Sequence, residues 1–204
     1  MGKRKNKLSK EEQAEVEEWI YQNNTEETRM TDTMTIRVKC KTENQKLLVN
    51  AIKEKEVIIC SGPAGTGKTF LACAEALRLI KKYTKYRKIV IVKSVTTLKN
   101  EEIGFLKGNL REKMEPFMFS FVHNFEKLVG QSITSKLREL KTIEEMPIAY
   151  MRGINLDRSI IIIDEAQNIS QENIRTIMTR LGRDSKMIFL GDERQQDSKG
   201  GNGL

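Results

Sequence analysis

Residues 58–70 read Ile-Ile-Cys-Ser-Gly-Pro-Ala-Gly-Thr-Gly-Lys-Thr-Phe, and this stretch decides the fold. The apolar run before the glycines predicts a buried strand over residues 56–60, and the apolar spacing after them predicts a helix over residues 68–82. A glycine-rich turn in this position that closes on Gly-Lys-Thr is a P-loop. Its backbone N–H groups converge on phosphate oxygens, and the helix N-terminus favours negative charge. We therefore expect a bound nucleoside triphosphate.

The P-loop residues have different expected roles in binding that nucleotide. Lys68 is placed to reach the β- and γ-phosphates, and Thr69 offers a hydroxyl to the Mg²⁺ that bridges them. The expected phosphate-binding residues are Gly62, Pro63, Ala64, Gly65, Thr66, Gly67, Lys68, Thr69 and Phe70.

A second acidic element follows another apolar run. Four isoleucines at residues 160–163 lead directly into Asp164 and Glu165, a Walker B pattern. Neighbouring acids at a strand end point in different directions, so we assign Asp164 to the metal and Glu165 to activation of a water. The alternative is a helix N-terminus whose acids offset the helix dipole. The P-loop upstream favours the Walker B interpretation.

A third polar element, Gly-Asp-Glu-Arg-Gln at residues 191–195, follows the apolar run 186–190. Asp192 and Gln195 are in a position to sense the γ-phosphate, although Gly-Asp alone is also common in ordinary turns. A P-loop kinase remains a rival, since it uses the same cradle but needs an acceptor pocket and no water-activating glutamate.

The order of strands and helices predicts an α/β fold with a mostly parallel sheet and helices on both faces. Binding then belongs at the carboxyl ends of the strands, where these polar residues lie. The other expected elements are an edge strand over residues 34–40, a helix from Thr42 to about Lys53, strands over 88–92, 159–163 and 186–190, a short strand over 147–151, helices and loops over 101–140, and a helix over 173–181.

Composition predicts one domain and a charged tail. We assign residues 1–33 to a charged tail or helix, basic at first and then acidic, and residues 34–204 to the domain. The net charge of +8 over 204 residues favours a polyanionic partner such as RNA or DNA. No apolar run approaches 18 residues, so we expect no membrane segment and a cytoplasmic location.

Several single residues have ordinary interpretations. Cys40, Cys60 and Cys73 lack ligand spacing and are expected as free thiols, the last two buried. His123 is expected to be a partly buried packing residue. The phenylalanines at 117, 119, 121 and 125 are expected to pack against the sheet, with base stacking as the alternative.

The combined motifs resemble the PhoH-like ATPase family. The residues that carry the resemblance are Thr-Glu-Asn-Gln at 42–45, the P-loop, Ile-Gly-Phe-Leu-Lys-Gly-Asn-Leu-Arg-Glu-Lys-Met-Glu-Pro at 103–116, Ala-Tyr-Met-Arg-Gly at 149–153, Asp-Glu-Ala-Gln-Asn at 164–168, Arg-Leu-Gly at 180–182, Ser-Lys-Met at 185–187 and Gly-Asp-x-x-Gln-x-Asp at 191–197.

This resemblance implies a RecA-like core related to superfamily 1 helicases that binds and hydrolyses ATP. It also implies single-stranded RNA or DNA as partner and ring-shaped homo-oligomers such as hexamers. In that pattern Gln45 reads the adenine edge, and Asp192 with Gln195 couples hydrolysis to movement. A nucleotide-dependent binding module with little turnover is the second hypothesis, and the kinase is the third.

Two departures bear on this expectation. Lys93-Ser94-Val95 stands where the family has an Arg-Pro type turn, and the sequence ends at Leu204 where the family continues through another helix and strand. Arg152, Arg180 and Arg194 are candidates for γ-phosphate contact, the first two also across a subunit boundary. Lys99, Lys107, Arg111 and Lys113 are candidates for a nucleic-acid path.

Overall fold

The computed structural model describes residues 30–93, 110–151 and 153–195. A five-stranded sheet with the order β1-β5-β4-β2-β3 forms its centre, and every paired neighbour in it is parallel. The strands are β1 (Val57–Ser61), β2 (Lys88–Lys93), β3 (Ile143–Glu145), β4 (Ser159–Asp164) and β5 (Lys186–Gly191). The predicted α/β class is therefore confirmed.

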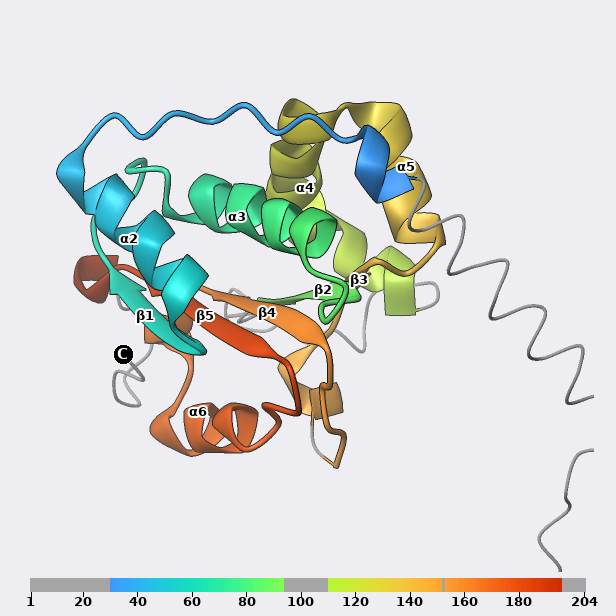
Figure 1. The fold of residues 1–204 in the computed structure, drawn as a ribbon. Coiled ribbons are helices and arrows are strands. Elements are labelled where there is room, and N and C mark those ends of the chain that lie inside the picture. The colour runs from blue at the N-terminus through green and yellow to red at the C-terminus, as the bar shows by residue number, and fades with distance from the viewer. Residues whose placement is uncertain (1–29, 94–109, 152, 196–204) are drawn as a thin grey trace, which may run out of the picture.

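Helices cover both faces of the sheet (Figure 1). On one face lie α2 (Glu43–Glu54), α3 (Lys68–Lys82), α4 (Leu110–Val129) and α5 (Gln131–Glu139). The other face carries α6 (Gln171–Met178) and the short 3-10 turn η2 (Ile148–Met151). Two further 3-10 turns, η3 (Ala166–Asn168) and η4 (Glu193–Gln195), follow β4 and β5.

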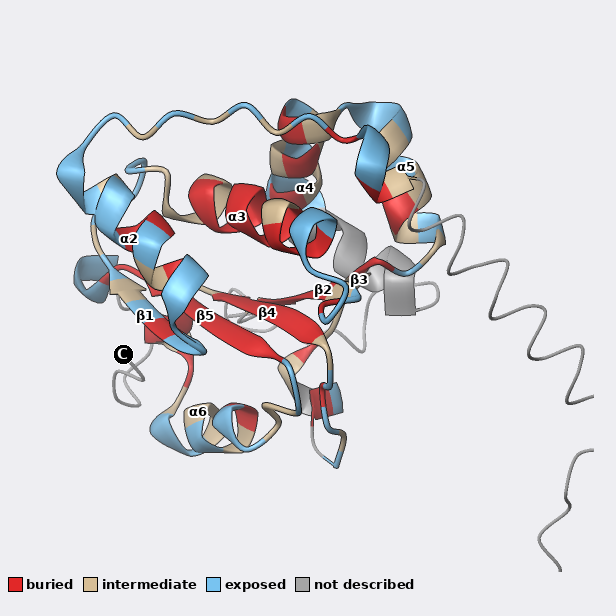
Figure 2. Cartoon of the chain, in the orientation of Figure 1, coloured by how far each residue is buried: buried red, intermediate tan, exposed pale blue. Residues whose placement is uncertain are grey.

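Strand alternation divides the core into two layers. In β4, Ile160 and Ile162 pack toward the α3 side, while Ile161 and Ile163 pack toward α6. All four are fully buried, as in the continuous red of the central strands in Figure 2. Unbroken apolar runs are expected where a parallel sheet is covered on both faces.

Helix α3 crosses the sheet closely because its inner positions are small. Ala72, Cys73, Ala74 and Ala76 have no exposed surface.

Thr42 caps α2 through its hydroxyl, which accepts a hydrogen bond from the Gln45 N–H at 3.2 Å. The expected helix beginning at the cap is therefore confirmed, and both helices bring their first turns to the P-loop.

The predicted edge strand over residues 34–40 is wrong. This segment is an extended strap that runs across α3 and pairs with no described strand (Figure 1). Its apolar residues still alternate inward, but helix side chains satisfy its carbonyls: Arg78 donates to the oxygens of Ile36 and Val38 at 3.2 and 3.1 Å. The alternation of apolar and polar residues indicates a half-buried extended chain, but it does not indicate whether that chain packs against a strand or a helix.

The predicted strand over 147–151 is also wrong, because Ile148–Met151 forms η2 and the nearby strand is β3.

His123 is exposed rather than partly buried, and its ring stacks on the exposed Phe119 at 6.1 Å between centroids. Phe121 and Phe125 do pack in the core, as predicted. The expectations for residues 1–29, Lys99, Lys107 and Arg152 lie outside the described residues, as do the side chains of Arg111, Lys113 and Phe117.

Candidate nucleotide-binding site

The P-loop joins β1 to α3 at the carboxyl edge of the sheet. Gly65 and Gly67 have φ values of 75° and 85°, a region that side chains with a Cβ rarely adopt. The loop is fixed to β5 by the Gly62 N–H, which donates to the Gly191 carbonyl at 3.1 Å. The glycines are therefore needed where the chain turns.

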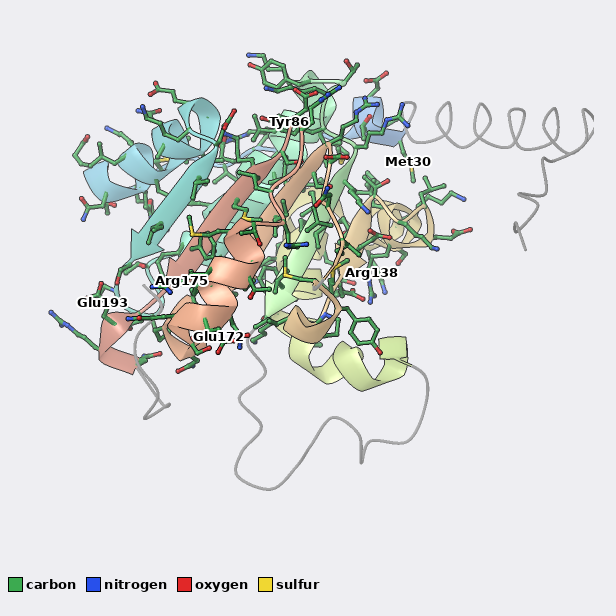
Figure 3. The ribbon with its side chains drawn as sticks, turned by 90° about the horizontal axis from the view of Figure 1, so that it is seen from below. Met30, Tyr86, Arg138, Glu172, Arg175 and Glu193 are labelled. Atoms are coloured by element: carbon green, nitrogen blue, oxygen red, sulfur yellow. The ribbon has the colours of Figure 1, made fainter. Side chains whose placement is uncertain are left out.

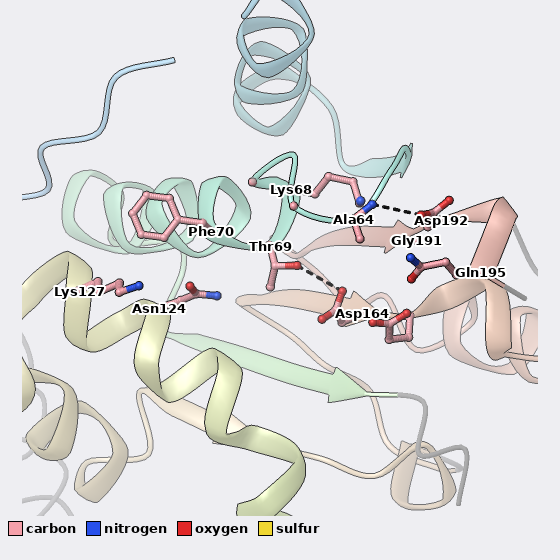
Figure 4. Close-up of a pocket in the computed structure, with 13 residues that line it drawn as sticks. Ala64, Lys68, Thr69, Phe70, Asn124, Lys127, Asp164, Gly191, Asp192 and Gln195 are labelled. Atoms are coloured by element: carbon pink, nitrogen blue, oxygen red, sulfur yellow. Dashed lines mark hydrogen bonds between the residues drawn. The ribbon is translucent and has the colours of Figure 1, made fainter. Parts of the chain in front are cut away.

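A pocket of about 660 Å³ opens over the loop (Figure 4). Residues from the P-loop, α4, β4, β5 and η4 line it: Ala64, Gly65, Gly67, Lys68, Thr69, Phe70, Asn124, Lys127, Asp164, Glu165, Gly191, Asp192 and Gln195. The pocket thus brings together the three elements that lie far apart in the sequence. The loop residues Gly62, Pro63 and Thr66 do not line this pocket, and neither does Gln45 of α2, which donates to the Thr66 carbonyl.

Lys68 folds back onto its own loop. Its ammonium donates to the carbonyls of Gly62 and Pro63 at 2.5 and 2.9 Å. The Thr66 hydroxyl also donates to the Pro63 carbonyl, at 2.8 Å. These contacts keep the cation beside the cradle, within the loop that phosphates would enter.

Thr69 and Asp164 face one another across the pocket floor, with 3.4 Å between Oγ1 and Oδ1 (Figure 4). Burial raises the pKa of Asp164, and the neighbouring Glu165 raises it further, whereas Lys93 and the Thr69 hydroxyl act in the opposite direction. Hard oxygen donors of this kind suit Mg²⁺, which takes one or two carboxylates together with waters and substrate phosphates. The donor set therefore fits the expected ion.

Glu165 sits in a left-handed backbone conformation, with φ 54° and ψ 39°, at the turn that follows β4. Glutamate is uncommon in this region, and such outliers cluster at functional sites. The turn places Glu165 directly after Asp164, and both residues line the pocket.

Gln167 connects these acids to the third element. It is fully buried, its Nε2 donates to Glu165 Oε2 at 2.7 Å, and its Oε1 accepts from the Asp192 N–H at 3.1 Å. The same Nε2 also lies 3.4 Å from the Gln195 carbonyl. Sequence reasoning gave Gln167 no role, because it is one of several polar residues in Asp-Glu-Ala-Gln-Asn at 164–168.

The wall formed by α4 was also missed. Asn124 and Lys127 stand one helical turn apart and line the pocket opposite the P-loop (Figure 4). No motif marks them, because only the packing of α4 beside α3 brings them to the site.

Among the arginine candidates, Arg180 has structural side-chain contacts, whereas the contact of Arg194 is made by its backbone. Arg180 donates to the carbonyls of Ile154 and Thr176 at 3.4 and 3.3 Å and to the Thr179 hydroxyl at 2.9 Å. The Arg194 N–H donates to Asp192 at 3.1 Å.

The three cysteines are free, with Cys73 buried and Cys60 partly buried, and burial raises the pKa of the Cys60 and Cys73 thiols. The described residues contain no cluster of three metal-binding side chains and no helix suited to crossing a membrane.

A comparison with known families decides the kinship. The profile of the PhoH-like protein family matches residues 37–204. The chain belongs to this family. The parallel sheet, with a P-loop after β1, agrees with the predicted fold of a RecA-like P-loop NTPase.

Individual PhoH-like relatives extend the match. The PhoH-like protein of Bacillus subtilis (strain 168) is 37% identical over 94% of this chain and 58% of its own length. That of Mycobacterium bovis (strain ATCC BAA-935 / AF2122/97) is 38% identical over 80% of this chain and 46% of its own. This chain therefore spans about half the length of these relatives. Among solved structures, the UvsW helicase from bacteriophage T4 has a TM-score of 0.47 and 12% identity over 85% of this chain and 61% of that chain.

Proposed function

We propose that the chain is a Mg²⁺-dependent ATPase whose turnover is coupled to single-stranded RNA or DNA. The convergence of the P-loop, the Thr69–Asp164 pair and Glu165 on one pocket is the observation that carries this proposal. The family match supports a nucleotide-binding function of the P-loop type.

The phosphate site requires one local exchange. Phosphate oxygens take over the Lys68 ammonium from the carbonyls of Gly62 and Pro63, and the loop N–H groups donate to the same oxygens. Both partners of the new Lys68 contacts are charged, whereas the carbonyl acceptors that they replace are neutral.

Gln45 retains the capacity to read adenine. Its Nε2 donates to the Thr66 carbonyl at 3.0 Å, and its Oε1 accepts from the Lys41 N–H at 2.6 Å. A carboxamide has a second hydrogen and a second lone pair. These match the N7 acceptor and the N6 donor of adenine, so Gln45 can hold the P-loop and the base together.

Thr69 and Asp164 would hold Mg²⁺ together with the phosphates. The ion neutralises charge on the transferred phosphoryl group. Glu165 would orient and deprotonate a water for attack on the γ-phosphate, while the Gln167 amide fixes its carboxylate at 2.7 Å. Asp192 and Gln195 would respond to the γ-phosphate through the Gln167 contacts.

Two features support a nucleic-acid partner. The net charge is +8, and α4 presents the exposed Phe119–His123 stack, whose faces can receive an unpaired base. Lys93 also provides a positive charge where the family has an Arg-Pro type turn, and it pairs with Asp164 in the register of β2 and β4. We place the protein in the cytoplasm, where such a partner is available.

A shared site between subunits would complete the γ-phosphate pocket. In a homo-oligomeric ring, an arginine from the next subunit supplies charge that is worth about 10³-fold or more in rate. Arg152 or Arg180 would serve this role, and Arg180 would have to leave its carbonyl partners to do so. Turnover per subunit that rises with protein concentration, alongside assembly seen by sedimentation, supports the ring; full activity in a monomer contradicts it.

Calorimetric titration tests the nucleotide site directly. We expect ATP and ADP to bind with Mg²⁺ and more weakly with EDTA. A chain that binds neither nucleotide contradicts the proposal. Binding without phosphate release supports the binding module, and transfer of phosphate to an acceptor supports the kinase.

A further inference from the structure

The turn between α3 and β2 carries dense positive charge far from the nucleotide pocket. Residues 81–88 read Lys-Lys-Tyr-Thr-Lys-Tyr-Arg-Lys, five cations and two tyrosines without an acid. Figure 3 shows Tyr86 at the opposite end of the strands from Glu193, which follows β5 beside the pocket. We call residues 81–88 the basic turn.

The basic turn is held in a fixed conformation. Tyr86 is only 7% exposed, its N–H donates to the Tyr83 carbonyl at 3.2 Å, and the two rings meet edge to face at 6.4 Å. Arg158 directly precedes β4, and its guanidinium donates to the carbonyls of Thr84 and Lys85 at 2.5 and 3.2 Å. A ligand would therefore meet a preorganised surface, which lowers the entropic cost of binding.

Cations and aromatic faces alternate on this surface. Lys82 Nζ lies 5.0 Å from the centre of the Tyr83 ring, and Lys85 Nζ lies 4.9 Å from that of Tyr86. Tyr83 remains 40% exposed. Lysines beside an accessible ring are the combination that holds single-stranded nucleic acid, since the cations contact phosphates and the ring stacks on a base.

A neighbouring hollow extends the surface. It has a volume of about 640 Å³ and is lined by Thr84, Lys85, Asp157, Arg158, Arg183 and Asp184. The Asp157 carboxylate is engaged within the loop, where Oδ1 accepts from the Arg183 N–H at 2.8 Å. At the edge of this region, burial and the nearby Lys85 lower the pKa of Lys186, against the effect of Glu56. The lining of the hollow itself has three cationic side chains and two aspartates, so its net charge is positive.

Structural roles account for only part of the charge. The C-terminal end of α3 carries about half a negative charge, which one lysine offsets. Lys81 donates to the carbonyls of Asp32 and Met34, and Lys88 pairs with Glu144 at 2.8 Å. Within the described ranges, no carboxylate lies within ion-pair distance of Lys82 or Lys85. Their Nζ atoms contact the tyrosine rings, and their charges are available to the phosphates of a ligand.

We propose that the basic turn, with Arg183 beside it, is a binding surface for single-stranded nucleic acid at the end of the sheet opposite the ATP pocket. The inference rests on the proposed nucleic-acid partner and adds a second contact region to it. Lys82, Lys85 and Arg183 bind phosphates, and Tyr83 stacks on an unpaired base.

Fluorescence anisotropy with labelled oligo(U), oligo(dT) and a duplex of the same length tests this surface at several salt concentrations. In the Lys82→Ala/Lys85→Ala variant, the dependence of log affinity on log salt should fall in slope by about 1.4, because each lost phosphate contact contributes about 0.7 on single strands. Tyr83→Ala should weaken single-strand binding about tenfold with an unchanged slope. The control Lys39→Ala/Arg175→Ala removes two exposed charges elsewhere, and thermal unfolding verifies that each variant folds.

The outcomes separate this inference from the proposed function. If wild-type protein binds single strands and the lysine variant matches the control, the inference is wrong and the proposed function stands. If wild-type protein binds no single strand at low salt, both the inference and the proposed nucleic-acid partner are wrong. Duplex binding as tight as single-strand binding, with no effect of Tyr83→Ala, also contradicts the inference. If the lysine variant binds oligo(U), oligo(dT) or both more weakly than the control does, the inference is supported. The oligonucleotide affected identifies the polynucleotide that binds.

Discussion

The Asp192 carboxylate accepts a hydrogen bond from the Ala64 N–H, with 3.1 Å between Oδ2 and N. The residues are 128 positions apart, and the contact joins the end of β5 to the phosphate-binding loop. The other carboxylate oxygen accepts from the Arg194 N–H at 3.1 Å, within the turn that carries Gln195. One buried side chain thus links the P-loop to the turn that we propose as the γ-phosphate sensor.

Replacement of this carboxylate should impair catalysis. In Asp192→Asn the amide nitrogen cannot accept a hydrogen bond, so one of the two N–H partners loses its acceptor. Hydrogen bonds to a charged group contribute about 1.5–3 kcal/mol, and we expect kcat/KM for ATP to fall about tenfold to a hundredfold. Steady-state kinetics measures this. Asp184→Asn, at an exposed turn position with φ 53°, is the control, and equal kinetics for the two variants would contradict the linkage.

Lys68→Ala should weaken nucleotide binding. The variant removes the point charge from the β- and γ-phosphates while the backbone cradle stays. Loss of one charged hydrogen-bonding group predicts a rise in Kd of about tenfold or more. Calorimetry gives the value, with the exposed Lys46→Ala as control. Undiminished ATP affinity would refute the assignment of Lys68.

The Gln167 contacts predict an effect on turnover rather than on binding. Gln167→Ala frees the Glu165 carboxylate and leaves the buried Asp192 N–H without its acceptor. Because Gln167 does not line the pocket, we expect kcat to fall about tenfold or more while KM changes little. Gln171→Ala, exposed at the start of α6, is the control. A change confined to KM would assign Gln167 to nucleotide binding instead.

The Asp164 carboxylate should lower the stability of the nucleotide-free protein, although it serves Mg²⁺ and ATP binding. Its raised pKa means that the folded, nucleotide-free protein disfavours the charged form, so ionisation at neutral pH costs stability. Asp164→Asn should therefore raise the Tm of the free protein and abolish its further increase with Mg²⁺ and ATP. The Tm difference should be fully present above the folded-state pKa and should disappear as pH falls toward the ordinary aspartate value. A lower Tm for the variant at neutral pH would contradict this account.

The sequence predicted the sheet and the phosphate site because both depend on local patterns. Glycine spacing marks the P-loop, and apolar runs that end in acids mark β4 and β5. Their convergence follows from the rule that carboxyl ends of parallel strands share an edge. Asp164, Glu165 and Asp192 could therefore be placed together without a structure.

The remaining contacts depend on packing that no local pattern encodes. Alternation over residues 34–40 is the same for a strand and for a strap over a helix, so the Arg78 contacts could not be foreseen. Asn124 reaches the pocket only because α4 packs beside α3. Phe119 and Phe121 lie in one helix, and only the direction of each side chain determines that the first is 73% exposed and the second fully buried.

Phosphate release from ATP, measured with Mg²⁺ or EDTA and with or without single-stranded RNA, tests the central claim most directly when wild-type protein is compared with Glu165→Gln. The account predicts Mg²⁺-dependent release that RNA stimulates, and a variant that binds ATP but releases phosphate about a hundredfold more slowly or worse, as expected for loss of a general base. Glu172→Gln, at an exposed position, should behave as wild type. Equal release by wild-type protein and Glu165→Gln, or release that persists in EDTA, would contradict the account.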